Sequence, residues 1–275
     1  MQALDLPSAD VERARLAARE LVLRFLALAA SDPASKRFDK LLDAEFQELA
    51  AAAARHLALD PAMRPPELAP GEVPPEELDL DPLIAALSAP RERLLDDHTR
   101  VFGLVVSKHC PPYEVQYCPQ TFSIYRSQRM ADVAGTYRAF GVEPGRDVPE
   151  RADHVACELE FLAWAVAKER HARVRSDKPS DEPWEERASV CRDAQRDFVA
   201  EHFAWWVPAF ARALADRARA LDPPAPFHAA LAHALATLVP AERAVLGVDP
   251  PTELARPRPD EEPAGDGCAG CGATS

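Results

Sequence analysis

Residues 130–161 read MADVAGTYRAFGVEPGRDVPERADHVACELEF, and this stretch decides the fold. In its first part, apolar side chains recur at helical spacing, at Met130, Val133, Ala134, Tyr137 and Phe140. Gly141 stands where a glycine ends a helix. After a turn-rich break, a second helical pattern carries two apolar stripes that together nearly encircle it. Such a pattern predicts a central, mostly buried helix.

Polar side chains interrupt the apolar surface of this second helix. It opens with Asp153 and His154, and Glu158 follows one turn after His154 on the same side. A carboxylate among apolar neighbours must be paired, hydrogen-bonded or protonated. The spacing leaves two interpretations open: a buried His154–Glu158 pair that fixes helix packing, or a binding or catalytic site.

The composition of the 275 residues favours an all-α protein. Hydrophobic residues make up 47%, with much Ala and Leu, and no stretch alternates strictly between apolar and polar. We expect a single helical domain over residues 1–248, with a proline-rich loop or linker at about 60–82, which holds seven prolines. Residues 249–275 are rich in proline and acid, and we expect them to be a disordered tail.

Helical periodicity also predicts further helices on both sides of the quoted stretch. They cover residues 11–30, 35–59, 82–89, 91–105, 184–202, 205–220 and 227–239. The segment 205–220 is expected to continue the helix before it, with a kink near Pro208.

The net charge narrows the classes of partner. The chain has 32 Lys and Arg against 45 Asp and Glu, a net charge of −13. Nucleic acid and anionic membranes are therefore unfavourable partners, whereas a basic partner is attracted. The run LVLRFLALAA is interrupted by Arg24 and is too short to span a bilayer. With no secretory signal, a cytoplasmic protein without stable membrane insertion is expected.

Known catalytic and metal motifs are absent from most of the chain. There is no phosphate-binding glycine loop, no H-E-x-x-H and no G-x-S-x-G, so enzyme function has little support and no cofactor is expected. Cys268 and Cys271 form a Cys-x-x-Cys pair, which supplies half of a tetrahedral metal site or a redox pair. The alternative interpretation of this pair is a dispensable tail.

Four segments in order resemble the TorD/DmsD/NarJ family of cytoplasmic redox-enzyme maturation chaperones. They are His98-Thr-Arg-Val-Phe-Gly103, Pro111-Pro-Tyr-Glu114, residues 130–141 and residues 150–161. The resemblance implies an all-helical TorD-like fold and a non-enzymatic chaperone. It implies binding of the twin-arginine leader or N-terminal segment of a molybdenum enzyme's catalytic subunit, until the molybdopterin cofactor is inserted and export or assembly proceeds.

The resemblance also suggests a peptide-binding site. The Asp-His pair of the family, implicated in leader or nucleotide binding, maps onto Asp153 and His154. In our hypothesis Asp153, Glu158 and Glu114 face the arginines, because carboxylates bind guanidinium groups bidentately. Phe102, Tyr113 and Tyr137 line the groove for the apolar part of the leader.

Two other functions stay open at this stage. One is a nucleotide- or small-molecule-binding enzyme that uses Asp153, His154 and Glu158. The other is a metal- or sulfur-handling protein that acts through Cys268 and Cys271. The sequence names no client, and a homodimer is compatible with it.

Overall fold

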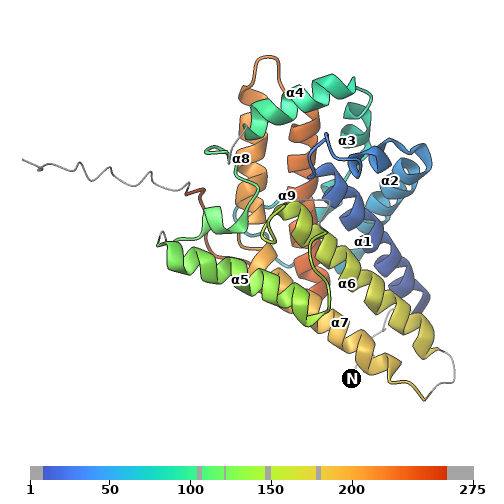
Figure 1. The fold of residues 1–275 in the computed structure, drawn as a ribbon. Coiled ribbons are helices and arrows are strands. Elements are labelled where there is room, and N and C mark those ends of the chain that lie inside the picture. The colour runs from blue at the N-terminus through green and yellow to red at the C-terminus, as the bar shows by residue number, and fades with distance from the viewer. Residues whose placement is uncertain (1–8, 104–106, 121, 146–149, 178–180, 259–275) are drawn as a thin grey trace, which may run out of the picture.

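The computed structural model describes residues 9–103, 107–120, 122–145, 150–177 and 181–258 (Figure 1). Within these ranges the regular structure is helical, which confirms the all-α prediction. The α-helices are α1 (Ala9–Ala29), α2 (Ala44–Leu59), α3 (Asp81–Ala86), α4 (Arg91–Phe102), α5 (Ser123–Ala139), α6 (Val155–Ser176), α7 (Trp184–Phe198), α8 (Val207–Ala220) and α9 (Pro226–Leu246).

The stretch 130–161 contains the second part of α5 and the beginning of α6. Gly141 follows α5 with a φ of +70°, and its N–H donates to the carbonyl of Arg138 at 2.9 Å. The N–H of Val142 donates to the carbonyl of Tyr137 at 3.1 Å, so the helix ends in a Schellman motif. Most of the side chains of α6 are buried, as its two apolar stripes predicted.

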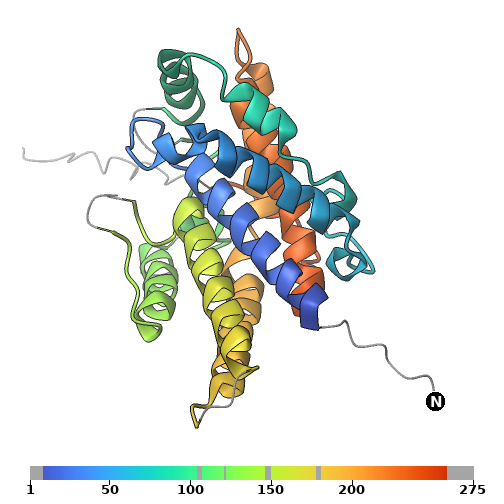
Figure 2. The ribbon, with the colours of Figure 1, turned by 90° about the vertical axis from the view of Figure 1, so that its right-hand side faces the viewer.

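Two buried helices organise the molecule. One is α6, which lies between α1 and α7 (Figures 1 and 2). The other is α9, which packs along α8, while α4 crosses the ends of both (Figure 1). In the described ranges, α9 is also the helix long and apolar enough to cross a membrane, and 78% of its apolar window is buried inside the molecule.

The proline-rich segment at residues 60–82 is hydrogen-bonded to α9 near a proline inside that helix. The predicted helix at 227–239 was too short, because α9 continues through Pro240 to Leu246. Pro240 has no N–H, so it cannot donate to the carbonyl of Ala236 four residues earlier. That carbonyl accepts from the N–H of Val73 at 3.0 Å instead. The carbonyl of Ala236, which Pro240 leaves without a donor inside the helix, thus binds the segment.

An ion pair fixes the same segment. Arg243 of α9 donates to both carboxylate oxygens of Glu72, each at 2.7 Å, and both side chains are buried. Met63, Leu78 and Leu80 of the segment are buried in the core. Residues 60–82 are therefore a loop packed on α9 and not a linker.

Residues 249–258 correct the expectation that disorder begins near Asp249. The N–H of Arg258 donates to the carbonyl of Gln116 at 2.5 Å, and its Nη1 donates to the carbonyl of Pro119 at 2.8 Å. These two contacts hold a proline-rich segment without regular secondary structure against the loop before α5. Residues 259–275, with Cys268 and Cys271, lie outside the described ranges.

Two expected helix boundaries are wrong. Residues 35–59 are not one helix: a short 3₁₀ turn, Phe38–Leu42, is followed by Asp43, whose side chain accepts from the N–H of Phe46 and begins α2. The continuation expected at residues 205–220 is instead interrupted at residues 204–206, just before Pro208. A π-helical turn, Val199–Phe203, ends α7, and Pro208 lies in the first turn of α8, where no N–H is needed.

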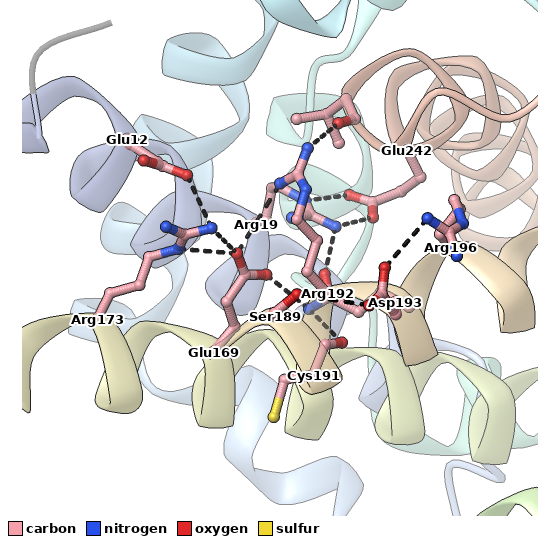
Figure 3. A network of polar contacts seen from close by, with 12 residues as sticks. Glu12, Arg19, Glu169, Arg173, Ser189, Cys191, Arg192, Asp193, Arg196 and Glu242 are labelled. Atoms are coloured by element: carbon pink, nitrogen blue, oxygen red, sulfur yellow. Dashed lines mark hydrogen bonds and ion pairs between the residues drawn. The ribbon is translucent and has the colours of Figure 1, made fainter. Parts of the chain in front are cut away.

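A buried ion network joins α1, α6, α7 and α9 (Figure 3). Arg19 donates to both carboxylate oxygens of Glu242, at 3.0 and 2.6 Å, and to the side-chain oxygen of Gln195 at 2.9 Å. Gln195 donates in turn to Glu169 at 2.8 Å. Arg173 closes the network from the surface side by donating to Glu169 at 2.9 Å.

Candidate functional site

The loop before α5 pairs with the start of α6 through the backbone. The N–H of Glu114 donates to the carbonyl of Asp153 at 2.9 Å, and the N–H of Val155 donates to the carbonyl of Pro112 at 2.9 Å. Tyr113 and His154 form an isolated antiparallel bridge. The pairing brings together Pro-Pro-Tyr-Glu and Asp-His, two motifs forty residues apart in the chain.

The carboxylate of Asp153 is fully buried and paired with an arginine. Arg151 donates from Nε and Nη2 to its two oxygens, at 2.9 and 2.8 Å, and the N–H of Val115 donates to the second oxygen at 3.3 Å. Burial raises the pKa of Asp153 above its usual value, although Arg151 and the backbone donor act in the opposite direction. The guanidinium of Arg151 lies over the ring of Tyr113, 4.6 Å from its centroid.

Glu114 has a similar environment from different elements. Its Oε1 accepts from Nε of Arg129 on α5 at 2.8 Å and from the indole N–H of Trp205 at 3.0 Å. Nδ1 of His202 lies 3.3 Å from both carboxylate oxygens. The guanidinium of Arg129 lies over the ring of Trp205, 5.1 Å from its centroid, and it also donates to the carbonyl of Glu201.

A surface pocket opens beside Glu114. It has a volume of about 510 Å³ and is lined by Cys118, Pro119, Gln120, Tyr125, Gln128, Arg129, Asp132 and Trp205. Both members of the stacked Arg129–Trp205 pair therefore border the pocket. Glu114 itself is covered by that pair and is fully buried.

His154 does not pair with Glu158, which corrects one of the two interpretations of their spacing. Nδ1 of His154 accepts from the N–H of Ala156 at 3.1 Å and so caps α6, while Nε2 lies 3.8 Å from Glu150. An N-cap side chain points back over the helix end, away from the next turn. Burial, with His98 and Arg151 nearby, lowers the pKa of His154 to about 3, so the ring is neutral.

Glu158 lies deeper than the other two carboxylates. One oxygen accepts from the indole N–H of Trp206 at 3.1 Å, and the other has no hydrogen-bond partner among the described residues. Burial raises the pKa of Glu158 well above its usual value, and the nearby Glu114 and Asp153 raise it further. A raised pKa favours the neutral acid, which is the form least costly to bury.

The two remaining predicted residues lie apart from each other. Tyr137 is buried, its hydroxyl donates to the carbonyl of Ala152 at 2.9 Å, and its ring packs on Phe161 at a centroid distance of 4.9 Å. Phe102 is half-buried on α4, where its ring packs against Phe210 and His228. Tyr137 thus supports the paired loop from within, whereas Phe102 belongs to the α4–α8–α9 corner.

Sequence reasoning missed five residues of this site. They are Arg129, Arg151, His202, Trp205 and Trp206. The last three lie in or just after the π-helical turn Val199–Phe203. In this turn the N–H of Ala204 donates to the carbonyl of Val199 five residues earlier. One extra residue in a helical turn rotates the side chains that follow it, and here these reach Glu114 and Glu158. A helical pattern in the sequence does not reveal such a turn.

The described residues contain no group of three or more His, Cys, Asp or Glu side chains that could hold a metal ion. Cys110 and Cys118, on the loop that carries Glu114, are free buried thiols. Burial raises the pKa of each to about 11, so both are unreactive at neutral pH. The buried carboxylates of Glu114 and Asp153, with the rings of Trp205 and Tyr113 beside them, can bind guanidinium groups.

Comparison with known proteins identifies the family of this chain. The model of the nitrate reductase delta subunit family matches residues 72–212, which include every predicted peptide-binding residue. The selenate reductase assembly chaperone of Thauera selenatis is 31% identical over 196 residues, covering 68% of this chain and 93% of the relative. The chlorate reductase assembly chaperone of Ideonella dechloratans is 33% identical over 103 residues, covering 34% of this chain and 49% of the relative.

A third relative has the same kind of name. The perchlorate reductase assembly chaperone of Dechloromonas aromatica is 31% identical over 77 residues, 28% of this chain and 30% of the relative. All three are named as assembly chaperones and not as catalysts. The extent of these matches confirms the resemblance carried by the four sequence segments, and the chain belongs to the nitrate reductase delta subunit family.

Proposed function

We propose that this chain is a cytoplasmic assembly chaperone for the catalytic subunit of an oxidoreductase that carries the molybdenum cofactor. It binds the twin-arginine leader or N-terminal segment of that subunit and holds the subunit until the cofactor is inserted. The observation that carries the proposal is the relative from Thauera selenatis, an assembly chaperone matched over 93% of its length. It acts by binding and has no catalytic activity.

The geometry supports recognition of arginine. Glu114 and Asp153 are fully buried carboxylates, and each already binds a guanidinium group. A buried carboxylate binds a guanidinium more strongly than an exposed one does, because the hydrogen bonds are charge-assisted and water does not compete for them. Two neighbouring carboxylates of this kind match the two arginines of a leader.

The other predicted residues support this site from different sides. Tyr113 presents its ring face to a guanidinium. His154 fixes the end of α6 beside Asp153, and Glu158 and Tyr137 underlie the paired loop. Phe102, half-buried at the α4 corner, is assigned to apolar contact with the later part of the client segment.

The proposal is tested by binding of the leader peptide from a co-encoded reductase, measured by calorimetry. We expect Glu114→Gln and Asp153→Asn each to weaken binding by about tenfold or more, since each removes a charged acceptor worth roughly 1.5–3 kcal/mol. Asp97→Asn is the matched control, because Asp97 is also buried and paired with Arg93 and Arg100 but lies on α4. Equal affinities for the wild type and both site variants would contradict the assignment.

A further inference from the structure

The two buried carboxylates Glu114 and Asp153 combine two features: each pairs with an arginine, and that arginine lies over an aromatic ring. Glu114 and the ring of Trp205 form one guanidinium site, which we call the Glu114 seat. Asp153 and the ring of Tyr113 form the other, the Asp153 seat. The carboxylate side chains are 0% exposed, whereas the arginines in the seats, Arg129 and Arg151, are 32% and 36% exposed.

Each carboxylate has a further hydrogen-bond donor besides its arginine. Glu114 is held by the indole N–H of Trp205 and lies within 3.3 Å of His202. Asp153 is held by the backbone N–H of Val115. Departure of an arginine would therefore leave a formed site and not a collapsed one, which is the property of a preorganised binding site.

We propose that Arg129 and Arg151 are internal occupants of these two seats, and that the paired arginines of a client leader displace them. The proposal rests on the proposed function, because the leader is its ligand. The exchange replaces one guanidinium by another, so neither carboxylate is left buried and unpaired in the complex. That removes the main energetic objection to a binding site made of fully buried acids.

The surroundings of Arg129 provide room for the exchange. Arg129 already borders the 510 Å³ pocket, and Asp132 lies three residues further along α5 and lines the same pocket. Side chains three residues apart on a helix are neighbours, so the displaced Arg129 has a second carboxylate within reach. The pocket is thus both the entrance for a client arginine and the destination of the resident one.

An exposed apolar patch adjoins this entrance. Phe122, Ile124 and Tyr125, at the start of α5, are 73%, 71% and 53% exposed, and Tyr125 also lines the pocket. Large apolar side chains gathered on a surface mark interaction sites. We assign to this patch the apolar residues that follow the arginines in a leader, which makes the partner an arginine-bearing apolar segment.

The seats are tested first without any client. Arg129→Gln and Arg151→Gln each empty one seat, and we expect the melting temperature of each variant to fall. Millimolar N-acetylargininamide should then raise it, whereas N-acetyllysinamide should not, because a lysine ammonium neither binds bidentately nor stacks in the same way. Arg93→Gln is the control: Arg93 is 34% exposed and pairs with the buried Asp97 in the same manner, but it is over no aromatic ring among the described residues.

The second measurement uses the leader peptide and the full chain. If the resident arginines compete with the client, Arg129→Gln and Arg151→Gln bind a twin-arginine peptide about tenfold more tightly than the wild type, because the binding-competent state is more populated. A leader that binds the wild type, with affinity unchanged or reduced in both variants, overturns the displacement and leaves the proposed function standing. Rescue by N-acetylargininamide without leader binding to the wild type supports the seats and contradicts the proposed function. Failure of N-acetylargininamide to stabilise either variant overturns the seats.

Discussion

Three buried carboxylates lie near the N-terminal end of α6, and among the described residues two of them pair with an arginine. Glu114 pairs with Arg129 and Asp153 with Arg151, whereas Glu158 has the indole N–H of Trp206. The third acid therefore cannot be ionised without cost, because it is buried and two negative groups lie close to it. At this scale Glu158 is a residue whose protonation is linked to folding.

We expect stability to depend on pH through Glu158. Its folded-state pKa is raised, so the folded chain binds a proton that the unfolded chain releases above its usual pKa of 4.5. The stability contributed by the protonated acid is full below that value and is lost as pH rises through the folded pKa. Glu158→Gln should flatten this loss above pH 4.5 in thermal unfolding. An unchanged slope would show that Glu158 does not titrate in this range.

At the same scale, the sequence predicted some partners and not others. The ordered motifs put Tyr113, Glu114, Asp153 and His154 in one site, and in the structure they are neighbours. The spacing of four residues also suggested a His154–Glu158 pair, which is wrong because His154 caps its own helix. Arg129 was missed because its pairing with Glu114, fifteen residues earlier in the chain, follows from tertiary geometry. Arg151 is only two residues before Asp153 and was missed because helical periodicity does not describe the loop before α6.

At the scale of elements, local sequence decides where helices end when a cap or a glycine is present. Gly141 and Gly247 end α5 and α9 with positive φ, and the first of these was predicted. The predicted helix 227–239 stopped before Pro240. The N–H of Val73 satisfies the carbonyl of Ala236, which Pro240 leaves without a donor, and the helix continues. The π-helical turn before Trp205 was missed because no residue pattern in the sequence predicts it.

The network in Figure 3 predicts that the contact between α1 and α9 is sensitive to the loss of a charge. Glu242→Gln leaves the guanidinium of Arg19 buried between α1 and α9 without its carboxylate. Removing one partner of a buried pair costs about 3–5 kcal/mol, so urea unfolding should show a loss of this size. Asp193→Asn is the control, because its ion pair with Arg196 is about half exposed. Exposed pairs contribute about 0–1 kcal/mol. A loss below about 1 kcal/mol for Glu242→Gln would contradict the role given to the network.

At the scale of the whole molecule, chain segments far apart in the sequence close on the candidate site. Residues 249–258 return to the loop that carries Glu114, and Arg258 contacts both Gln116 and Pro119. Composition alone predicted disorder there, because proline and acid are typical of unstructured segments. Backbone donors and acceptors on the loop override that composition, which only the tertiary fold reveals.

This closure makes a final prediction that separates the C-terminal segment from the Cys-x-x-Cys pair. A chain ending at residue 258 keeps the contacts of Arg258 to Gln116 and Pro119, and we expect it to bind the leader as the full chain does. A chain ending at residue 248 loses these bonds, each worth about 1 kcal/mol, so the Glu114 loop is held less firmly. Leader affinity should then fall by roughly tenfold, measured by calorimetry at one salt concentration. If the chain ending at residue 258 already shows the loss of leader affinity, the segment that holds Cys268 and Cys271 contributes to binding. The alternative of a metal- or sulfur-handling tail then gains support over a purely helical peptide site.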